Sequence, residues 1–111
     1  MKNHRIKHAS IHCHDSKLVI SGDLCFSTVT KVWRASLSLL VKQPHWLFDF
    51  SQVKSCNSAA LALVLEWLKY AKRENKTIQL LHLPQQLLSI AKVAGVEQIL
   101  NGHVDISLIK D

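Results

Sequence analysis

The hydrophobic periodicity of this chain changes repeatedly between that of a strand and that of a helix, and this constrains the fold more than any other feature. Apolar and polar residues alternate over residues 8–15, and a turn at Asp15-Ser16 and a second strand over 17–24 follow, which predicts a β-hairpin. Apolar residues recur at helical spacing over 27–43, and Pro44 should end that helix. The dense apolar run 46–50 is typical of a central, parallel strand buried on both faces.

The second half of the chain repeats this order of strand and helix. A helix begins at Ser58, a strand is predicted over 77–83, and a further helix has Pro84 in its first turn and Gly95 at its end. The tail 103–110 alternates weakly and is interpreted as a last strand or a docked extension. Strands joined through helices predict an α/β fold with a mixed sheet that is parallel in its later part.

The composition bounds the class of protein. The chain has 111 residues, 48% of them hydrophobic, which suffices for one modest core, and we expect a single domain over residues 1–111. The first residues carry charges and histidines, and the longest uncharged apolar run, Ala59–Leu65, is too short to cross a bilayer. The three cysteines lie in no metal-like spacing. We therefore expect a cytoplasmic protein with reduced thiols.

The net charge of +6 comes from basic residues that are scattered along the chain, with no run of five. This distribution argues against a dedicated nucleic-acid groove. It favours a solvated surface that tolerates an anionic membrane nearby.

The predicted helix from Ser58 has an unusually wide apolar arc. One stripe along it consists of Leu61, Val64, Leu65 and Leu68. At 100° per residue, Leu63 lies well away from this stripe. The sequence leaves two interpretations of Leu63 open, an exposed leucine available to a partner or a second core contact.

The start of the same helix is bare, in the sense that its first residues have small side chains. Asn57 and Ser58 are both good capping residues, and the small side chains of Ala59, Ala60 and Ala62 follow. Unpaired amides at a helix start attract an anion or a partner's acceptor groups, and small side chains let another backbone approach. The alternative is that Asn57 or Ser58 only caps a core helix.

The residues from Asp49 to Trp67, DFSQVKSCNSAALALVLEW, resemble the signature of STAS domains. In that signature an aspartate and a serine end a strand, a valine follows, and a serine opens a helix of small residues and leucines. The matching positions are Asp49, Ser51, Val53, Ser58 and Leu61. Residues 18–33 are similar to the family's G-D/E-L turn and first helix, and residues 83–100 to its last helix. The resemblance implies the STAS fold, a mixed four- to five-stranded sheet with helices packed against it.

Two residues depart from this signature. Asn57 stands where the family has an acidic residue before the helix serine, and Ala60 replaces a glycine two residues after that serine. Asparagine still caps a helix but lacks the carboxylate expected beside a serine that a kinase recognises. We therefore expect Ser58 to act without being phosphorylated. Alanine favours the helix over glycine by about 1 kcal/mol.

Within the family, the tryptophan in TVTKVW and the leucine-rich helix look most like the MlaB group. This implies a non-catalytic cytoplasmic protein without a cofactor, held at the inner membrane only through its partner. That partner is the ATPase of an ABC transporter that moves phospholipids between the membranes of Gram-negative bacteria. Together with the bare helix start, the resemblance predicts a partner-binding surface of Asn57, Ser58, Ala59, Ala62 and Leu63.

The alternative within the STAS family is an anti-sigma factor antagonist. Its partner is an anti-sigma factor kinase, and Ser58 is the possible phosphorylation site. A phosphate on Ser58 gains from the helix dipole but blocks a partner by its charge and bulk.

Two other candidate sites favour simpler interpretations. The histidines of one parity near the first strand are His4, His8, His12 and His14. Neutral imidazoles at a solvent edge, without orienting carboxylates, are more typical of surface residues than of a metal site. Cys56 with His82 or His103 lacks the orienting third group of a thiol nucleophile. We expect neither bound zinc nor nucleotide hydrolysis.

Overall fold

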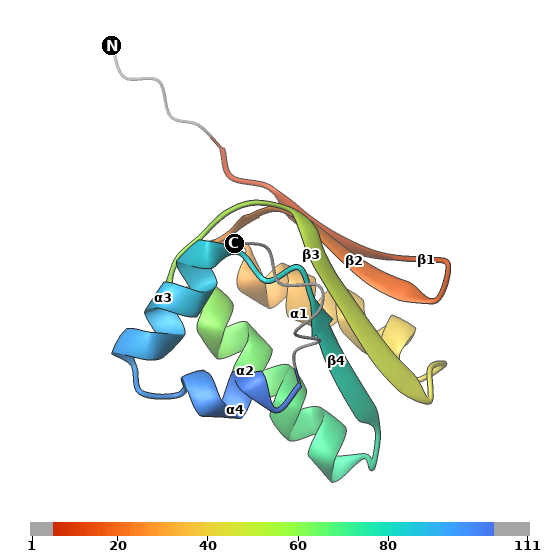
Figure 1. The fold of residues 1–111 in the computed structure, drawn as a ribbon. Helices are drawn as coiled ribbons and strands as arrows, with labels where there is room; N and C mark the ends of the chain where they lie inside the picture. Colours follow the sequence, from red (N-terminus) through yellow and green to blue (C-terminus); the bar gives the residue numbers. More distant parts are fainter. Residues whose placement is uncertain (1–5, 104–111) are drawn as a thin grey trace.

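The computed structural model describes residues 6–103 of the 111-residue chain. Figure 1 shows the course of the chain, with the helices gathered on one side of a twisted sheet. The elements in chain order are β1 (Ala9–His14), β2 (Lys17–Leu24), α1 (Val29–Leu40), β3 (His45–Cys56), α2 (Ser58–Arg73), β4 (Thr77–Leu81), α3 (Gln85–Val93) and α4 (Glu97–Asn101).

The four strands form one mixed sheet in the order β1-β2-β3-β4. β1 and β2 are an antiparallel hairpin, and the turn residues Asp15 and Ser16 have positive φ angles of 51° and 65°. β2 and β4 both run parallel to β3. Right-handed crossovers through α1 and α2 place both helices on the same face of the sheet. The predicted mixed α/β sheet is confirmed, with four strands in the part of the chain that the structure describes.

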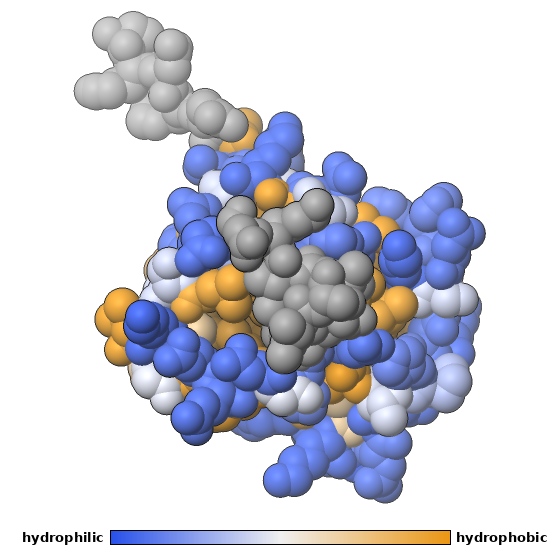
Figure 2. Space-filling model, viewed as in Figure 1, coloured by the Kyte–Doolittle hydropathy of each residue, from blue (hydrophilic) through white to orange (hydrophobic). Residues whose placement is uncertain are grey.

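The core lies between this face of the sheet and the helices. The buried side chains of the strands on this face are Ile11, Leu18, Ile20, Leu24, Trp46, Phe48, Phe50, Ile78 and Leu80. They follow the period of two expected of strands. In the view of Figure 2 the surface is mostly hydrophilic, and its apolar side chains form small separate groups.

A short chain of contacts ties α1, α2 and the sheet together. The indole ring of Trp67 in α2 stacks on Phe48 of β3, with 4.1 Å between ring centroids. Its Nε1 donates a hydrogen bond of 3.0 Å to Ser36 Oγ in α1. The Ser36 hydroxyl in turn donates to the Trp33 carbonyl at 2.6 Å. Ser36 and Trp67 are fully buried, so the polar groups of the α1–α2 contact are satisfied inside the core.

The signature aspartate shapes β3. Asp49 Oδ1 accepts a hydrogen bond of 2.9 Å from the Ser51 amide. Between the pairs Val19–Asp49 and Ser21–Gln52, β3 advances three residues while β2 advances two, which is a β-bulge. A second register shift, between the pairs Gly22–Val53 and Asp23–Ser55, follows closer to the end of β3.

The second half of the fold departs from the predicted elements in one respect. Gly95 has a φ of +76° and follows α3, as predicted, but a short additional helix, α4, comes after it. A helix of five residues is too short to show a clear period in sequence. The His103 carbonyl accepts a hydrogen bond from the Leu80 amide of β4 at 2.8 Å. The rest of the predicted tail strand, residues 104–110, lies outside the described residues.

Candidate functional site

The site is centred on the start of α2, which follows the bulged end of β3. Asn57 has extended backbone angles, and its Oδ1 accepts a hydrogen bond from the Ala59 amide at 2.8 Å. Its own amide donates to the Leu24 carbonyl at 3.1 Å, which ties the cap to the end of β2. Asn57 is therefore the N-cap, and Ser58 is the first residue of the helix.

The first turns of α2 are only partly accessible. Asn57, Ser58 and Ala62 are exposed, as a partner-binding surface requires. Ala59 and Leu63 are only 2% and 4% exposed, so the expected exposure of these two side chains is wrong. The helix contacts the sheet on one side and α1 on another, and the second contact buries Leu63. The interpretation of Leu63 as a second core contact is confirmed.

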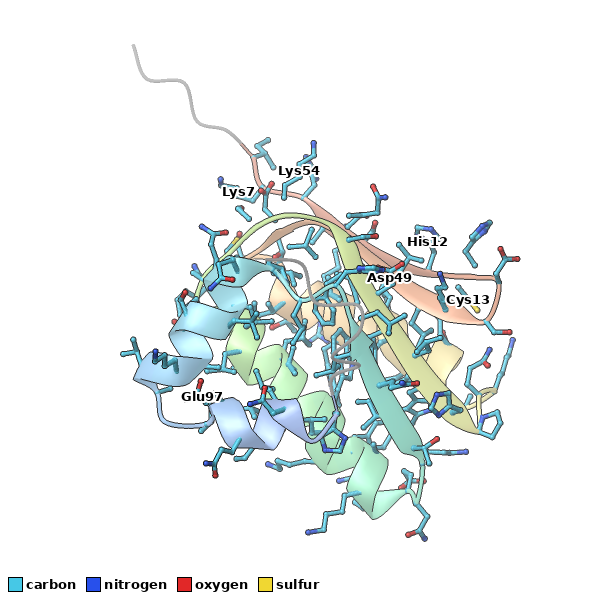
Figure 3. All side chains as sticks on the ribbon, in the orientation of Figure 1. Lys7, His12, Cys13, Asp49, Lys54 and Glu97 are labelled. Carbon is cyan, nitrogen blue, oxygen red and sulfur yellow. The ribbon has the colours of Figure 1, made fainter. Side chains whose placement is uncertain are left out.

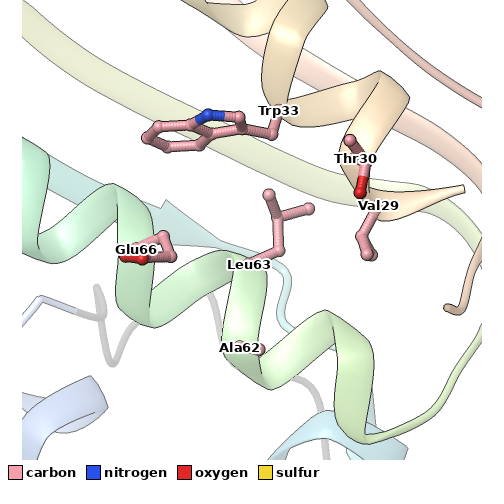
Figure 4. A pocket seen from close by; sticks show the side chains of 6 residues that line it. All are labelled: Val29, Thr30, Trp33, Ala62, Leu63 and Glu66. Carbon is pink, nitrogen blue, oxygen red and sulfur yellow. The ribbon is translucent and has the colours of Figure 1, made fainter.

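An open groove of about 280 Å³ separates the first halves of α1 and α2. The residues that line this α1–α2 groove are Val29, Thr30 and Trp33 from α1 and Ala62, Leu63 and Glu66 from α2. Figure 4 shows the Trp33 ring and the Leu63 side chain facing each other across it. The helical periodicity of residues 27–43 gave no sign that Val29 and Trp33 line a groove with α2.

Aromatic packing holds the wall of the groove in place. The Trp33 ring meets the edge of the Tyr70 ring, with centroids 5.7 Å apart and an interplanar angle of 62°. Tyr70 also packs on Trp46 at 5.3 Å. Because Trp33 packs against Tyr70 yet remains half-buried, it offers a preorganised apolar surface.

The groove has one charged residue at its rim. The Glu66 carboxylate pairs with Lys69 at 3.4 Å, one turn along α2, and both side chains are more than half exposed. Such a pair contributes little to stability. The groove itself is therefore an apolar floor with a solvated ion pair beside it, which suits the insertion of an apolar side chain.

The loop between β2 and α1 borders the same end of the sheet. Thr28 Oγ1 donates to the Asp23 carbonyl at 2.7 Å and accepts from the Cys25 amide at 3.0 Å, which fixes the loop. Phe26 is 74% exposed in this loop, three residues before Val29. A large aromatic residue in a loop is the sequence signal that could have marked this region.

The thiols at this end differ in their environments. Hydrogen bonds from the Ser27 side chain and backbone lower the pKa of Cys25, with a smaller contribution from the charge of Lys7. Burial raises the pKa of Cys56, which disfavours its thiolate. A nucleophilic role for Cys56 with His82 or His103 therefore gains no support.

The described histidines in β1 and directly before it lie on the surface. His8, His12 and His14 are exposed, while His4 lies outside the described residues. Among the residues that the structure describes, no group of three or more histidine, cysteine, aspartate or glutamate side chains is arranged to hold a metal ion. Within residues 6–103, no helix combines the length and apolar character needed to cross a membrane.

Comparisons with known proteins agree with the fold and the signature residues. A family model described as the MlaB STAS domain matches residues 8–105, which include every helix and strand of the structure. The "intermembrane phospholipid transport system binding protein MlaB" of Haemophilus influenzae is 31% identical over 85 residues. The match covers 71% of this chain and 79% of that protein.

Proposed function

Because the chain belongs to the STAS family and is of its MlaB type, we propose that it is a non-catalytic subunit that binds the cytoplasmic ATPase of a phospholipid-transporting ABC complex. In this role it supports the assembly or activity of a complex that maintains outer-membrane lipid asymmetry. It is cytoplasmic, needs no cofactor, and reaches the inner membrane through its partner.

The observation that carries this proposal is the α1–α2 groove beside the exposed start of α2. Interface cores between proteins are enriched in aromatic side chains and depleted in charged ones. Trp33 provides the aromatic surface, and Ala62 leaves room for a partner's backbone to approach. A preformed apolar groove of this kind receives an anchoring side chain at little cost in conformational entropy.

The proposed docking surface therefore extends from α2 onto α1. On α2 it consists of Asn57, Ser58 and Ala62, which are exposed. Ala59 and Leu63 lie beneath it, and Leu63 forms the floor of the groove.

The test is co-purification of the ATPase with variants of this surface. Ala62→Arg and Ser58→Glu each place a charge that the partner must desolvate, and we expect binding to fall by about a hundredfold or more. Both variants should fold, because Ala62 is exposed and arginine is a good helix former. A glutamate at position 58 is favoured by the helix dipole.

Matched controls place the same residue types elsewhere on exposed positions. Ala94→Arg at the end of α3 and Ser38→Glu in the last turn of α1 should bind the ATPase like the wild type. Circular dichroism verifies the fold of all four variants. If Ala62→Arg and Ser58→Glu are folded and still bind normally, the docking surface lies elsewhere and the bare helix start is only a cap.

We further propose that Ser58 acts unmodified in this contact. The Asn57 side chain is engaged as the cap, and the acidic residue typical of a kinase-recognised serine is missing. Intact-mass analysis of the protein from its native host should show no phosphorylated population. A substantial phosphorylated population that maps to Ser58 supports the anti-sigma factor antagonist instead.

A further inference from the structure

A second concave surface lies at the same end of the sheet, where the chain enters β1. Its volume is about 540 Å³, and Ile6, His8, Lys31 and Lys54 are among the residues that line it. Lys7 lies between Ile6 and His8 in the chain and is not itself a lining residue; Figure 3 labels it at the edge of this surface, in the segment that enters β1. These five residues, referred to below as the lysine patch, come from the segment before β1, from α1 and from β3.

The fold brings Lys31 and Lys54 together here, and Lys7 lies beside them in the segment that enters β1. Lys7, Lys31 and Lys54 are exposed, and none forms an ion pair with a carboxylate within the described part of the chain. The acidic residue that lines this surface, Asp23, is only 8% exposed and accepts a hydrogen bond from Ser55 Oγ at 2.7 Å. The outward-facing charge of the patch is therefore positive.

An apolar side chain stands beside these charges. Ile6 is 77% exposed and directly precedes Lys7. Lysines next to an exposed aliphatic side chain are typical of surfaces that rest on lipid headgroups, where the charges meet phosphates and the apolar group enters the interface.

The chemistry of the patch also distinguishes between classes of partner. Lysine is depleted from interfaces between proteins, where aromatic residues and arginine are enriched, and neither occurs in the described lining of this patch. Nonspecific binding of single-stranded nucleic acid uses aromatic platforms for base stacking, which the patch also lacks. A fluid anionic surface needs no such groups, because mobile headgroups adjust to the lysine positions.

We propose that the lysine patch binds the anionic headgroups of a membrane surface. Each lysine close to an anionic membrane strengthens binding by about fivefold, so the three together contribute about a hundredfold. Such binding is weak for an isolated domain, and it becomes effective when a second attachment holds the domain near the bilayer. The inference stands on the patch alone and does not require the proposed ATPase contact.

The experiment is flotation of the full-length chain with lipid vesicles. One set consists of equal parts phosphatidylglycerol and phosphatidylcholine, and the other of phosphatidylcholine alone. We expect the wild type to float with the anionic vesicles at 50 mM salt and to be released at 500 mM salt. The double variant Lys31→Glu/Lys54→Glu should lose more than tenfold in binding. The matched control Lys42→Glu/Lys92→Glu has the same change in net charge at exposed positions outside the patch and should lose much less.

Each remaining outcome decides the proposal. The proposal is overturned if the wild type does not float with anionic vesicles. It is also overturned if both double variants lose binding equally, since the net charge alone then explains the binding. It is also overturned if the patch variant floats normally but no longer binds a fluorescent single-stranded oligonucleotide or the ATPase. A patch variant that loses vesicle binding but still co-purifies with the ATPase supports two separate surfaces.

Discussion

The α1–α2 groove and the lysine patch lie at the same end of the sheet, yet different forces maintain them. The groove is made of side chains that also belong to the core, such as Leu63, which is 4% exposed. The lysine patch is made of exposed side chains, none of which belongs to the core. Substitutions in and under the groove should therefore change stability together with binding. Substitutions of the lysines should change binding alone.

The largest effect is expected for Gly22 of β2, whose backbone lines the surface of the lysine patch. Gly22 has a φ of +94°, and a Cβ atom added to it would lie 2.1 Å from the backbone oxygen of His8. Gly22→Ala must displace the β1 backbone, with strain of about 3 kcal/mol in the free energy of unfolding. Urea denaturation measures this loss. A glycine without such a contact provides the control: Gly102→Ala, whose added Cβ meets nothing closer than 3.7 Å, should cost far less. If the two variants are equally stable, β1 can shift without cost, and the backbone beneath the lysine patch is not rigid.

The next effect concerns the support of the groove. Ser36→Ala removes the acceptor of the Trp67 indole in a fully buried site, which should lower the free energy of unfolding by about 2 kcal/mol. Trp67→Phe in the same background removes the unsatisfied donor. The double variant should therefore be less unstable than the sum of the two single variants. Additive losses in this double-mutant cycle would contradict a direct hydrogen bond between the two helices.

A smaller effect is expected at the helix start. Asn57→Ala removes the hydrogen bond to the Ala59 amide and should cost about 1 kcal/mol of stability. Asn57→Asp keeps an acceptor and adds a charge that the helix dipole favours, so it should be at least as stable as the wild type. Thermal unfolding of the wild type and the two variants compares their unfolding temperatures. If Asn57→Ala unfolds at the wild-type temperature, the cap does not stabilise the docking surface.

The smallest effect concerns Cys25, a thiol in the loop between β2 and α1 that senses the charge of Lys7. Its pKa is lowered while that of Cys56 is raised, so at neutral pH Cys25 holds more thiolate and should react faster with iodoacetamide. Hydrogen bonding to Ser27 is the main cause and the charge of Lys7 a minor one. Lys7→Gln should therefore slow the alkylation of Cys25 by about twofold or less, because solvent screens an exposed charge. Peptide mass mapping over time measures both rates. Faster labelling of Cys56 would contradict the difference in environment.

The sequence predicted most of the elements because local patterns encode them. The alternation in 8–15 and the strand-like segment 17–24 became β1 and β2, and the apolar run 46–50 became the first half of β3. The STAS signature also located the start of α2 at Ser58. Helix α4 was missed because one turn and a half of helix carries too little periodicity to be recognised.

The sequence by itself determined the order of strands and helices, the family and the position of the capped helix start, since each depends on residues close together in the chain. Only the tertiary structure decided which side chains of α2 are accessible. A period of 3.6 residues says which side chains share a face, but not how many neighbours cover the helix, and α1 covers the face that contains Leu63. The α1–α2 groove and the lysine patch each combine residues more than twenty positions apart, and only the folded chain brings these together.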